Sequence, residues 1–161
     1  MSRLTPDQAG GANVCAFLDM LAWSEIGPGL LAHSDDGYDV LVGSTERAPL
    51  LFASYATHPG VFNARCNSTA AGRYQILHRY WPAYRDLLKL PDFGPESQDR
   101  IAIQMIHEQH ALPDVIAGNL ADAIGNVSNI WASLPGNAYH QHVNALDGLR
   151  AAYLAAGGTL A

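Results

Sequence analysis

The stretch FLDMLAWSE, residues 17–25, carries the strongest structural signal in this chain. Leu18, Leu21 and Glu25 recur at three- and four-residue spacing, which is typical of the buried stripe of an amphipathic helix. Glu25 lies one helical turn beyond Leu21, so its carboxyl should point along the side that faces the core. A Gly-Pro-Gly tripeptide at residues 27–29 follows at once and predicts the end of the helix.

The position of Glu25 allows two interpretations. At the end of a buried stripe, facing a loop, the carboxyl would be half desolvated, and desolvation raises the pKa of a carboxyl because it disfavours the charged form. A carboxyl that stays protonated near neutral pH can act as a general acid. The alternative is an ordinary helix-end glutamate that turns into solvent. Spacing alone leaves both open, because perturbed carboxylates are a minority of all carboxylates.

The composition predicts one globular domain. The chain has 161 residues, and 48% of them are hydrophobic, which suffices for a core and is too high for disorder. We expect a single domain over residues 1–161, with residues 1–12 as a loose arm. The formal net charge of −6 argues against general nucleic-acid binding, which needs a basic face.

Targeting signals and cysteines further restrict the class of protein. No segment has the length of a transmembrane helix, and residues 1–12 lack the pattern of a signal peptide. We therefore expect a protein that folds in a cytoplasm and has no stable membrane binding. The two cysteines, Cys15 and Cys66, show no metal-type spacing. Buried free thiols are expected, and the sequence leaves a disulfide bridge open.

Apolar periodicity, caps and breakers predict the remaining elements. Thr5 to Gln8 has the form of a capping box, the main helix should begin near Asn13, and Trp131 should lie in the core. Short strands at 38–42 and 50–55 predict a β-hairpin. A helix capped by Ser68 or Thr69 is expected to carry Tyr74, Gln75, Leu77 and His78. Further helices are expected at 80–88, 96–110, 113–117, 120–127 and 139–156, and solvated loop charges at Asp35 and Asp36. The fold class is α+β, mostly helical.

Segments in sequence order resemble the bacteriophage lambda endolysin family, which are peptidoglycan lytic transglycosylases. The matching segments are FLDMLAWSE (17–25), GYDVLVG (37–43), AGRYQIL (71–77), DFGPESQD (92–99) and SNIWASLPG (128–136). The resemblance extends over residues 17–158, and motifs in a shared order are far more specific than any one alone. It implies a lysozyme-like α+β fold, mostly helical, with a small β-hairpin lip beside the cleft.

The resemblance also implies a reaction that needs one carboxylate. Glycosidic cleavage requires a proton for the leaving oxygen and stabilisation of an oxocarbenium-like centre. By resemblance, Glu25 protonates the β-1,4 bridging oxygen between N-acetylmuramic acid and N-acetylglucosamine. It then acts as base towards the sugar's own 6-hydroxyl, which closes a 1,6-anhydro ring without any cofactor. The implied protein is a monomeric endolysin in the host cytoplasm that reaches the wall after a membrane-permeabilising holin has acted.

The same segments nominate substrate-binding residues. Asp39 could bind sugar hydroxyls, oppose Glu25 in a two-carboxylate muramidase reaction, or satisfy amides in a turn. Ser24 could hold the Glu25 carboxyl or the substrate, or bond back to the helix backbone. Tyr74 offers an aromatic face, and Gln75 offers both a donor and an acceptor. The expected substrate contacts are Ser24, Asp39, Ser68, Arg73, Tyr74, Gln75, Ser128, Asn129 and Tyr139.

Two other functions stay open. The pairs His107 and His110, and His140 and His142, could in principle bind zinc, as in peptidoglycan amidases, but the spacing does not match His-Glu-x-x-His. The second alternative is a non-catalytic wall-binding module on a lysozyme scaffold. Retention of Glu25 together with the cleft segments argues against that module.

Overall fold

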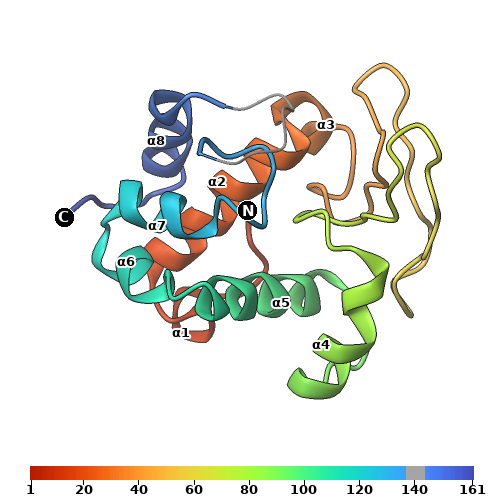
Figure 1. The fold of residues 1–161 in the computed structure, drawn as a ribbon, viewed down its shortest axis with the longest axis horizontal. Coiled ribbons are helices and arrows are strands. Elements are labelled where there is room, and N and C mark those ends of the chain that lie inside the picture. Colours follow the sequence, from red (N-terminus) through yellow and green to blue (C-terminus); the bar gives the residue numbers. More distant parts are fainter. Residues whose placement is uncertain (137–143) are drawn as a thin grey trace. The chain divides into compact units, whose positions relative to one another are not determined.

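The computed structural model describes residues 1–136 and 144–161, which fold into two compact units (Figure 1). One unit comprises residues 1–24 and 102–161, and the other comprises residues 25–101. The helices are α1 (Pro6–Ala9), α2 (Ala12–Ile26), α3 (Pro28–Ala32), the 3-10 turn η1 (His78–Tyr80), α4 (Trp81–Leu88), α5 (Pro95–Glu108), α6 (Leu112–Ala117), α7 (Leu120–Val127) and α8 (Leu146–Ala155). Whether the whole chain forms a single domain stays a prediction.

Helix α2 forms the core of the first unit. Phe17, Leu18 and Leu21 have no exposed surface, and Ala16 and Met20 on the other sides of the helix are equally buried. A helix that is apolar nearly all round packs in the interior. The helix begins at Ala12, one residue before the predicted cap. Trp131 is 2% exposed, which confirms its predicted place in the core.

The end of α2 is set by a backbone conformation that glycine favours. Gly27 has φ +82°, a left-handed value that breaks the helical path, so α2 ends at Ile26 as predicted. Pro28 then opens α3 at once, because proline suits the first turn of a helix. The sequence predicted only a loop here and missed this short helix.

The first twelve residues are not a loose arm, which corrects that expectation. Leu4 is 3% exposed and Ala9 is 6% exposed. The backbone N–H of Ser2 donates to Oδ1 of Asp19 at 2.6 Å. The predicted capping box is present, with Thr5 and Gln8 bonded reciprocally at the start of α1. Burial of apolar side chains and these bonds together hold the segment in place.

The predicted hairpin is present as backbone pairing and not as two regular strands. Val40 pairs with Leu51 in an isolated antiparallel bridge. The N–H of Leu41 donates to the carbonyl of Leu50 at 2.8 Å, and the N–H of Phe52 donates to the carbonyl of Asp39 at 2.9 Å. The predicted pairing of these two segments is therefore correct, while the pairing is too short for strands.

The helix predicted to follow Ser68 or Thr69 and to carry Tyr74 and Gln75 is wrong. Ala71 and Ile76 exchange two backbone hydrogen bonds of 3.0 Å each and enclose a tight four-residue turn. Gly72 has φ +78° and Gln75 has φ +48°. Two left-handed residues within one turn are incompatible with a right-handed α-helix. The Gly-Arg-Tyr-Gln segment is thus a turn that presents its side chains in different directions.

The other helices agree closely with the prediction. Helices α4, α5, α6 and α7 lie within two residues of their expected bounds, and Pro82 occupies the first turn of α4. Helix α8 starts at Leu146 instead of residue 139, and residues 139–143 lie outside the described part of the chain. Within that described part, no helix combines the length and the apolar character that a membrane span requires.

Gln98 of α5 holds three separate stretches of the second unit together. Its side chain is fully buried; Oε1 accepts from the N–H of Arg73 at 2.9 Å. Its Nε2 donates to the carbonyls of Tyr38 at 3.0 Å and Phe93 at 2.9 Å. A Cβ at Gly72 would lie only 2.1 Å from Oε1, so the close approach of this turn to α5 also requires glycine.

Replacing Gln98 with alanine should destabilise the fold strongly. The change leaves the N–H of Arg73 and the carbonyls of Tyr38 and Phe93 buried without their bonds to Gln98, and we expect a loss of roughly 3–5 kcal/mol in the free energy of unfolding. Gln104→Ala on the same helix is the matched control, because within residues 1–136 and 144–161 the Gln104 side chain bonds to Glu108 alone, in an exposed contact. Urea denaturation measures both, and similar midpoints for the two variants would contradict this account of Gln98.

Candidate active site

Glu25 lies in the last turn of α2 and is the first residue of the second unit. Its side chain is half-buried, while Leu18 and Leu21 on the same helical stripe are fully buried. This is the placement that the spacing predicted, and it differs from that of a fully solvated helix-end glutamate. The expected rise in the pKa of Glu25 stays a prediction.

Ser24 has a structural role that the sequence did not indicate. Its hydroxyl is hydrogen bonded to the hydroxyl of Ser133 at 2.7 Å and accepts from Nδ2 of Asn144 at 3.0 Å. The N–H of Asn144 also donates to the carbonyl of Ser133 at 2.9 Å. Ser24 therefore ties residues 133 and 144 to the end of α2. Its hydroxyl thus bonds to these two residues in place of the Glu25 carboxyl or the helix backbone, and contact of Ser24 with the substrate stays a prediction.

Asp39 acts within its own turn. Its side chain is half-buried, and Oδ1 accepts from the N–H of Asp35 at 2.9 Å. Asp35 in turn accepts from the hydroxyl of Tyr55 at 2.7 Å through Oδ2, so it is not the solvated charge that was expected. These bonds match the interpretation of Asp39 as a turn residue that satisfies amides. A role towards sugar stays a proposal.

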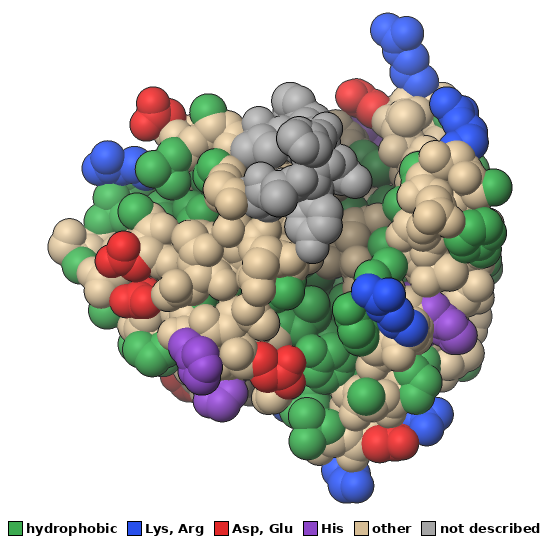
Figure 2. Space-filling model, in the orientation of Figure 1, with side chains coloured by type: hydrophobic (Ala, Val, Ile, Leu, Met, Phe, Trp, Pro, Cys, Tyr) green, Lys and Arg blue, Asp and Glu red, His purple; other side chains and the backbone are tan. Residues whose placement is uncertain are grey.

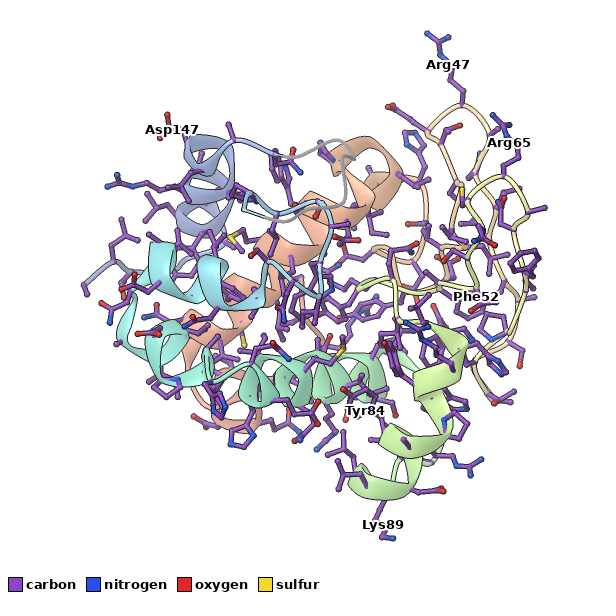
Figure 3. All side chains as sticks on the ribbon, in the orientation of Figure 1. Arg47, Phe52, Arg65, Tyr84, Lys89 and Asp147 are labelled. Atoms are coloured by element: carbon purple, nitrogen blue, oxygen red, sulfur yellow. The ribbon has the colours of Figure 1, made fainter. Side chains whose placement is uncertain are left out.

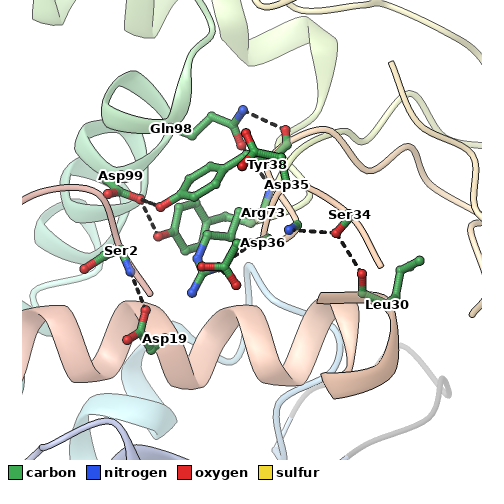
Figure 4. A network of polar contacts seen from close by, with 12 residues as sticks. Ser2, Asp19, Leu30, Ser34, Asp35, Asp36, Tyr38, Arg73, Gln98 and Asp99 are labelled. Carbon is green, nitrogen blue, oxygen red and sulfur yellow. Dashed lines mark hydrogen bonds and ion pairs between the residues drawn. The ribbon is translucent and has the colours of Figure 1, made fainter. Parts of the chain in front are cut away.

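Asp36 and Arg73 form an internal ion pair. Arg73 is 1% exposed, and its guanidinium lies 3.0 Å from the Asp36 carboxylate. The same guanidinium donates to the carbonyl of Asp36 and lies 5.1 Å from the centre of the Tyr38 ring (Figure 4). Asp36 was expected to be a solvated charge, and this is wrong, because a buried guanidinium needs an anion beside it.

Asp99 of α5 accepts hydrogen bonds from two buried tyrosine hydroxyls. Tyr38 donates to its Oδ1 at 2.8 Å and Tyr74 at 2.6 Å, and all three residues are fully buried (Figure 4). Burial raises the pKa of Tyr38 and of Tyr74, and the neighbouring Asp99 charge raises each further. Both phenols therefore remain protonated donors across the pH range in which proteins fold.

Arg73 and Tyr74 are buried, and whether either of them contacts sugar stays a prediction. Both side chains were expected to line the substrate site, but the turn at residues 71–76 directs them inward, to Asp36 and to Asp99. We interpret both as residues that position the turn. His58 supports the same turn, because its buried ring is hydrogen bonded through Nε2 to the carbonyl of Ile76 at 2.9 Å.

Gln75 differs from its two neighbours. It is half-buried, and its Nε2 donates to the carbonyl of Gly72 at 2.9 Å. Its Oε1 makes no hydrogen bond with any residue that the structure describes. The turn thus fixes the Gln75 amide while its acceptor oxygen stays available for a ligand.

The remaining predicted contacts lie at several places. Ser68 accepts from the N–H of Ala70 at 3.1 Å, and Ser128, 8% exposed, donates back to the carbonyl of Gly125 at 2.9 Å. Asn129 is exposed and donates to Gln109 at 2.7 Å. Tyr139 lies outside the described residues. These bonds are local, and whether these side chains contact substrate stays a prediction.

The histidines and cysteines can be placed only in part. His107 and His110 are exposed, whereas His140 and His142 lie outside the described residues, so the predicted cluster cannot be assembled. Among residues 1–136 and 144–161, no three His, Cys, Asp or Glu side chains are grouped as metal ligands would be. Both cysteines are free. Cys15 is half-buried, as a packed thiol would be, but Cys66 is exposed, which corrects the expectation of burial.

Gln98 and Asp99 were not predicted as important residues, although the sequence contains a signal for them. Both lie in the recognised segment 92–99, and Gln98 precedes Ile101 and Ala102 on the apolar stripe of α5. A polar residue on such a stripe must have hydrogen-bond partners when it is buried. The sequence cannot show which partners, because Tyr38 and Arg73 are distant in the chain.

Comparison with known proteins assigns the chain. A family model described as Endolysin matches residues 15–160. The endolysin of Escherichia phage P2 is 47% identical over 91% of this chain and 93% of its own length. The endolysin of Escherichia phage lambda is 48% identical over 90% of this chain and 91% of its own length.

Solved structures give the same result. A bacteriophage lambda lysozyme complexed with a chitohexasaccharide has a TM-score of 0.85 and 46% identity, and covers 94% of this chain and 97% of that one. A second structure of lysozyme from bacteriophage lambda has a TM-score of 0.81 and 44% identity over the same shares of both chains. These matches confirm the predicted lysozyme-like fold, and the chain belongs to the endolysin family.

Proposed function

We propose that this endolysin is a lytic transglycosylase that cleaves the β-1,4 bond between N-acetylmuramic acid and N-acetylglucosamine in peptidoglycan. The observation that carries the proposal is Glu25, a half-buried carboxyl at the end of a buried helix, within a chain of this family. The chitohexasaccharide in the similar lambda lysozyme structure supports a glycan as substrate. No cofactor is needed for this chemistry.

One carboxyl can serve both halves of the reaction. Protonated Glu25 gives its proton to the bridging oxygen, and the bond from that oxygen to the anomeric carbon breaks. The 6-hydroxyl of the same sugar then attacks the anomeric carbon and loses its proton to the Glu25 carboxylate. A 1,6-anhydro ring forms, the acid is restored, and no water is consumed.

Other residues position or bind the sugar in this proposal. Ser24 fixes the end of α2 through Ser133 and Asn144, and Arg73 and Tyr74 fix the turn that carries Gln75. The available Oε1 of Gln75 suits the N–H of an N-acetyl group. Asp39, Ser68, Ser128, Asn129 and Tyr139 complete the proposed set of substrate contacts.

Replacing Glu25 with glutamine should abolish most activity without loss of stability. Glutamine keeps the shape but has no transferable proton, and general acid–base catalysis contributes typically ~10²–10⁴ in rate. Because one group acts as both acid and base, we expect a loss at the upper end. Asp39→Asn is the comparison, since an amide oxygen can still accept from the N–H of Asp35 and no proton transfer is lost.

Mass spectrometry of digested peptidoglycan tests this pair of variants. The wild-type protein should release muropeptides with anhydro ends. If the products instead carry reducing ends, and the Asp39→Asn protein is folded but inactive, the enzyme is a muramidase that hydrolyses the bond with two carboxylates. Free peptide stems would indicate an amidase and direct attention to the histidines. Binding to sacculi without any cleavage would indicate a wall-binding module.

Variants of the turn should separate positioning from substrate contact. Tyr74→Phe removes a buried bond to Asp99 and should lower the free energy of unfolding by about 1–3 kcal/mol while kcat/KM of the folded protein changes little. Gln75→Asn keeps a residue that tolerates a left-handed backbone but retracts the amide, so KM should rise with little change in stability. Thermal denaturation and initial rates check both, and the opposite pattern would contradict the two assignments.

We further propose that the protein is a monomer that accumulates in the host cytoplasm and depends on a membrane-permeabilising holin. The support is membership of a phage endolysin family. Expression of this chain alone should leave the culture turbid until the inner membrane is breached with chloroform. Spontaneous lysis of the intact culture, with the protein recovered in the periplasm, would overturn this proposal.

A further inference from the structure

Two tight turns in the second unit each carry an arginine at the tip. Thr45 and Ala48 exchange backbone hydrogen bonds of 3.3 and 3.1 Å around Arg47. Asn63 and Ser68 exchange bonds of 2.8 and 3.2 Å around Arg65. The Asn63 side chain also accepts from the N–H of Arg65 at 3.0 Å, which fixes the second tip. Both arginines therefore project from ordered turns.

The two turns pack side by side. Nδ2 of Asn63 donates to the carbonyl of Val42 at 2.9 Å. A Cβ at Gly43 would lie 2.3 Å from Asn63 Nδ2 and 3.2 Å from Cys66 Sγ, so the second turn rests directly on the residue before the first. Arg47 extends outward at the end of its loop, and Arg65 lies on the neighbouring loop (Figure 3). We call this paired surface, residues 44–48 and 63–68, the double tip.

The cations of the double tip are not neutralised. Arg73, Arg85 and Arg100 each have a carboxylate within 3.3 Å. Arg47 and Arg65 are exposed and form no ion pair with any residue in the described ranges. Glu46 lies beside Arg47 in sequence, but its carboxylate rests over Gly29. Figure 2 shows Lys or Arg side chains at the upper right, at this end of the loops, and others spread over the same face, in a chain of net charge −6.

Exposed apolar side chains flank both turns. Leu50 and Leu51, just after the first turn, are 44% and 42% exposed, and Val61 and Phe62, just before the second, are 49% and 59% exposed. Guanidinium groups next to exposed apolar side chains are characteristic of recognition surfaces, where arginine is enriched.

We propose that the double tip binds carboxylates of the peptide stems of peptidoglycan, an inference that rests on the proposed function. Arginine forms forked, bidentate hydrogen bonds with carboxylates. The stems are short peptides that carry free carboxylates and methyl groups, which match the guanidinium and apolar parts of the surface. An anionic membrane is disfavoured, because each cation contributes only about 1 kcal/mol there and recognition usually needs four to eight of them.

The test compares Arg47→Ala/Arg65→Ala with a matched double variant, Lys89→Asn/Arg150→Ala, which removes two other exposed cations. Asparagine suits position 89 because Lys89 has φ +55°. On intact peptidoglycan at low salt, the Arg47/Arg65 variant should raise KM about 3- to 10-fold with kcat unchanged, as expected for two surface ion pairs. The control should change KM little, and about 0.5 M salt should remove the difference.

Glycan strands stripped of their stems by an amidase complete the experiment. On these strands the Arg47/Arg65 variant should have the wild-type KM. An equal loss on both substrates would mean that the arginines contact sugar or support the fold, and no loss on either would mean that the double tip binds nothing on the wall; both results overturn the proposal. Weaker binding of the Arg47/Arg65 variant to phosphatidylglycerol vesicles, with unchanged KM on peptidoglycan, would also overturn the proposal and would indicate a membrane-binding surface.

Co-sedimentation with purified peptidoglycan keeps this test separate from the proposed chemistry. Weaker sedimentation of the Arg47/Arg65 variant than of its control is expected whether the products carry anhydro or reducing ends. If the wild-type protein makes no anhydro product, the proposed reaction fails and the stem contact can still stand. Equal sedimentation of variant and control overturns the stem contact alone.

Discussion

The second unit depends on two adjacent polar side chains buried on one helix. Gln98 and Asp99 of α5 have no exposed surface, and between them they bind two phenols, one backbone N–H and two carbonyls. Polar groups in a low-dielectric interior are costly when unsatisfied and strongly orienting when every partner is present. This pair therefore fixes where the loop at residue 38 and the turn at residues 71–76 can lie.

The same pair separates positioning residues from residues that remain available to a ligand. Arg73 and Tyr74 are engaged in the interior by Asp36 and Asp99, so they hold the turn in place. Gln75, the next residue, is half-buried, and its Oε1 has no hydrogen-bond partner among the residues that the structure describes. Residues 73–75 therefore differ in role although they are consecutive, because a tight turn points successive side chains in different directions.

Ser24 has a comparable role in the first unit. It adjoins Glu25, and its hydroxyl holds residues 133 and 144 against the end of α2. These hydrogen bonds are enough to explain why a serine lies next to the proposed catalytic acid. A contact between Ser24 and the reacting groups is not needed for that explanation. Hydrogen bonds between residues more than 100 apart in sequence are visible only in the folded protein.

The sequence by itself determined most of the helices and the family, and it led to the proposal for Glu25. Periodicity and caps are local, so α2, α4, α5 and α7 were predicted within two residues, and ordered motifs identified the family. Prediction from the sequence failed where residues that are distant in the chain determine the local conformation. The turn at 71–76 contains two left-handed residues and is held by Gln98 through the N–H of Arg73, and Asp36 is half-buried beside the Arg73 guanidinium. Local pattern carries propensity, whereas the partner of a buried polar group is set by tertiary packing alone.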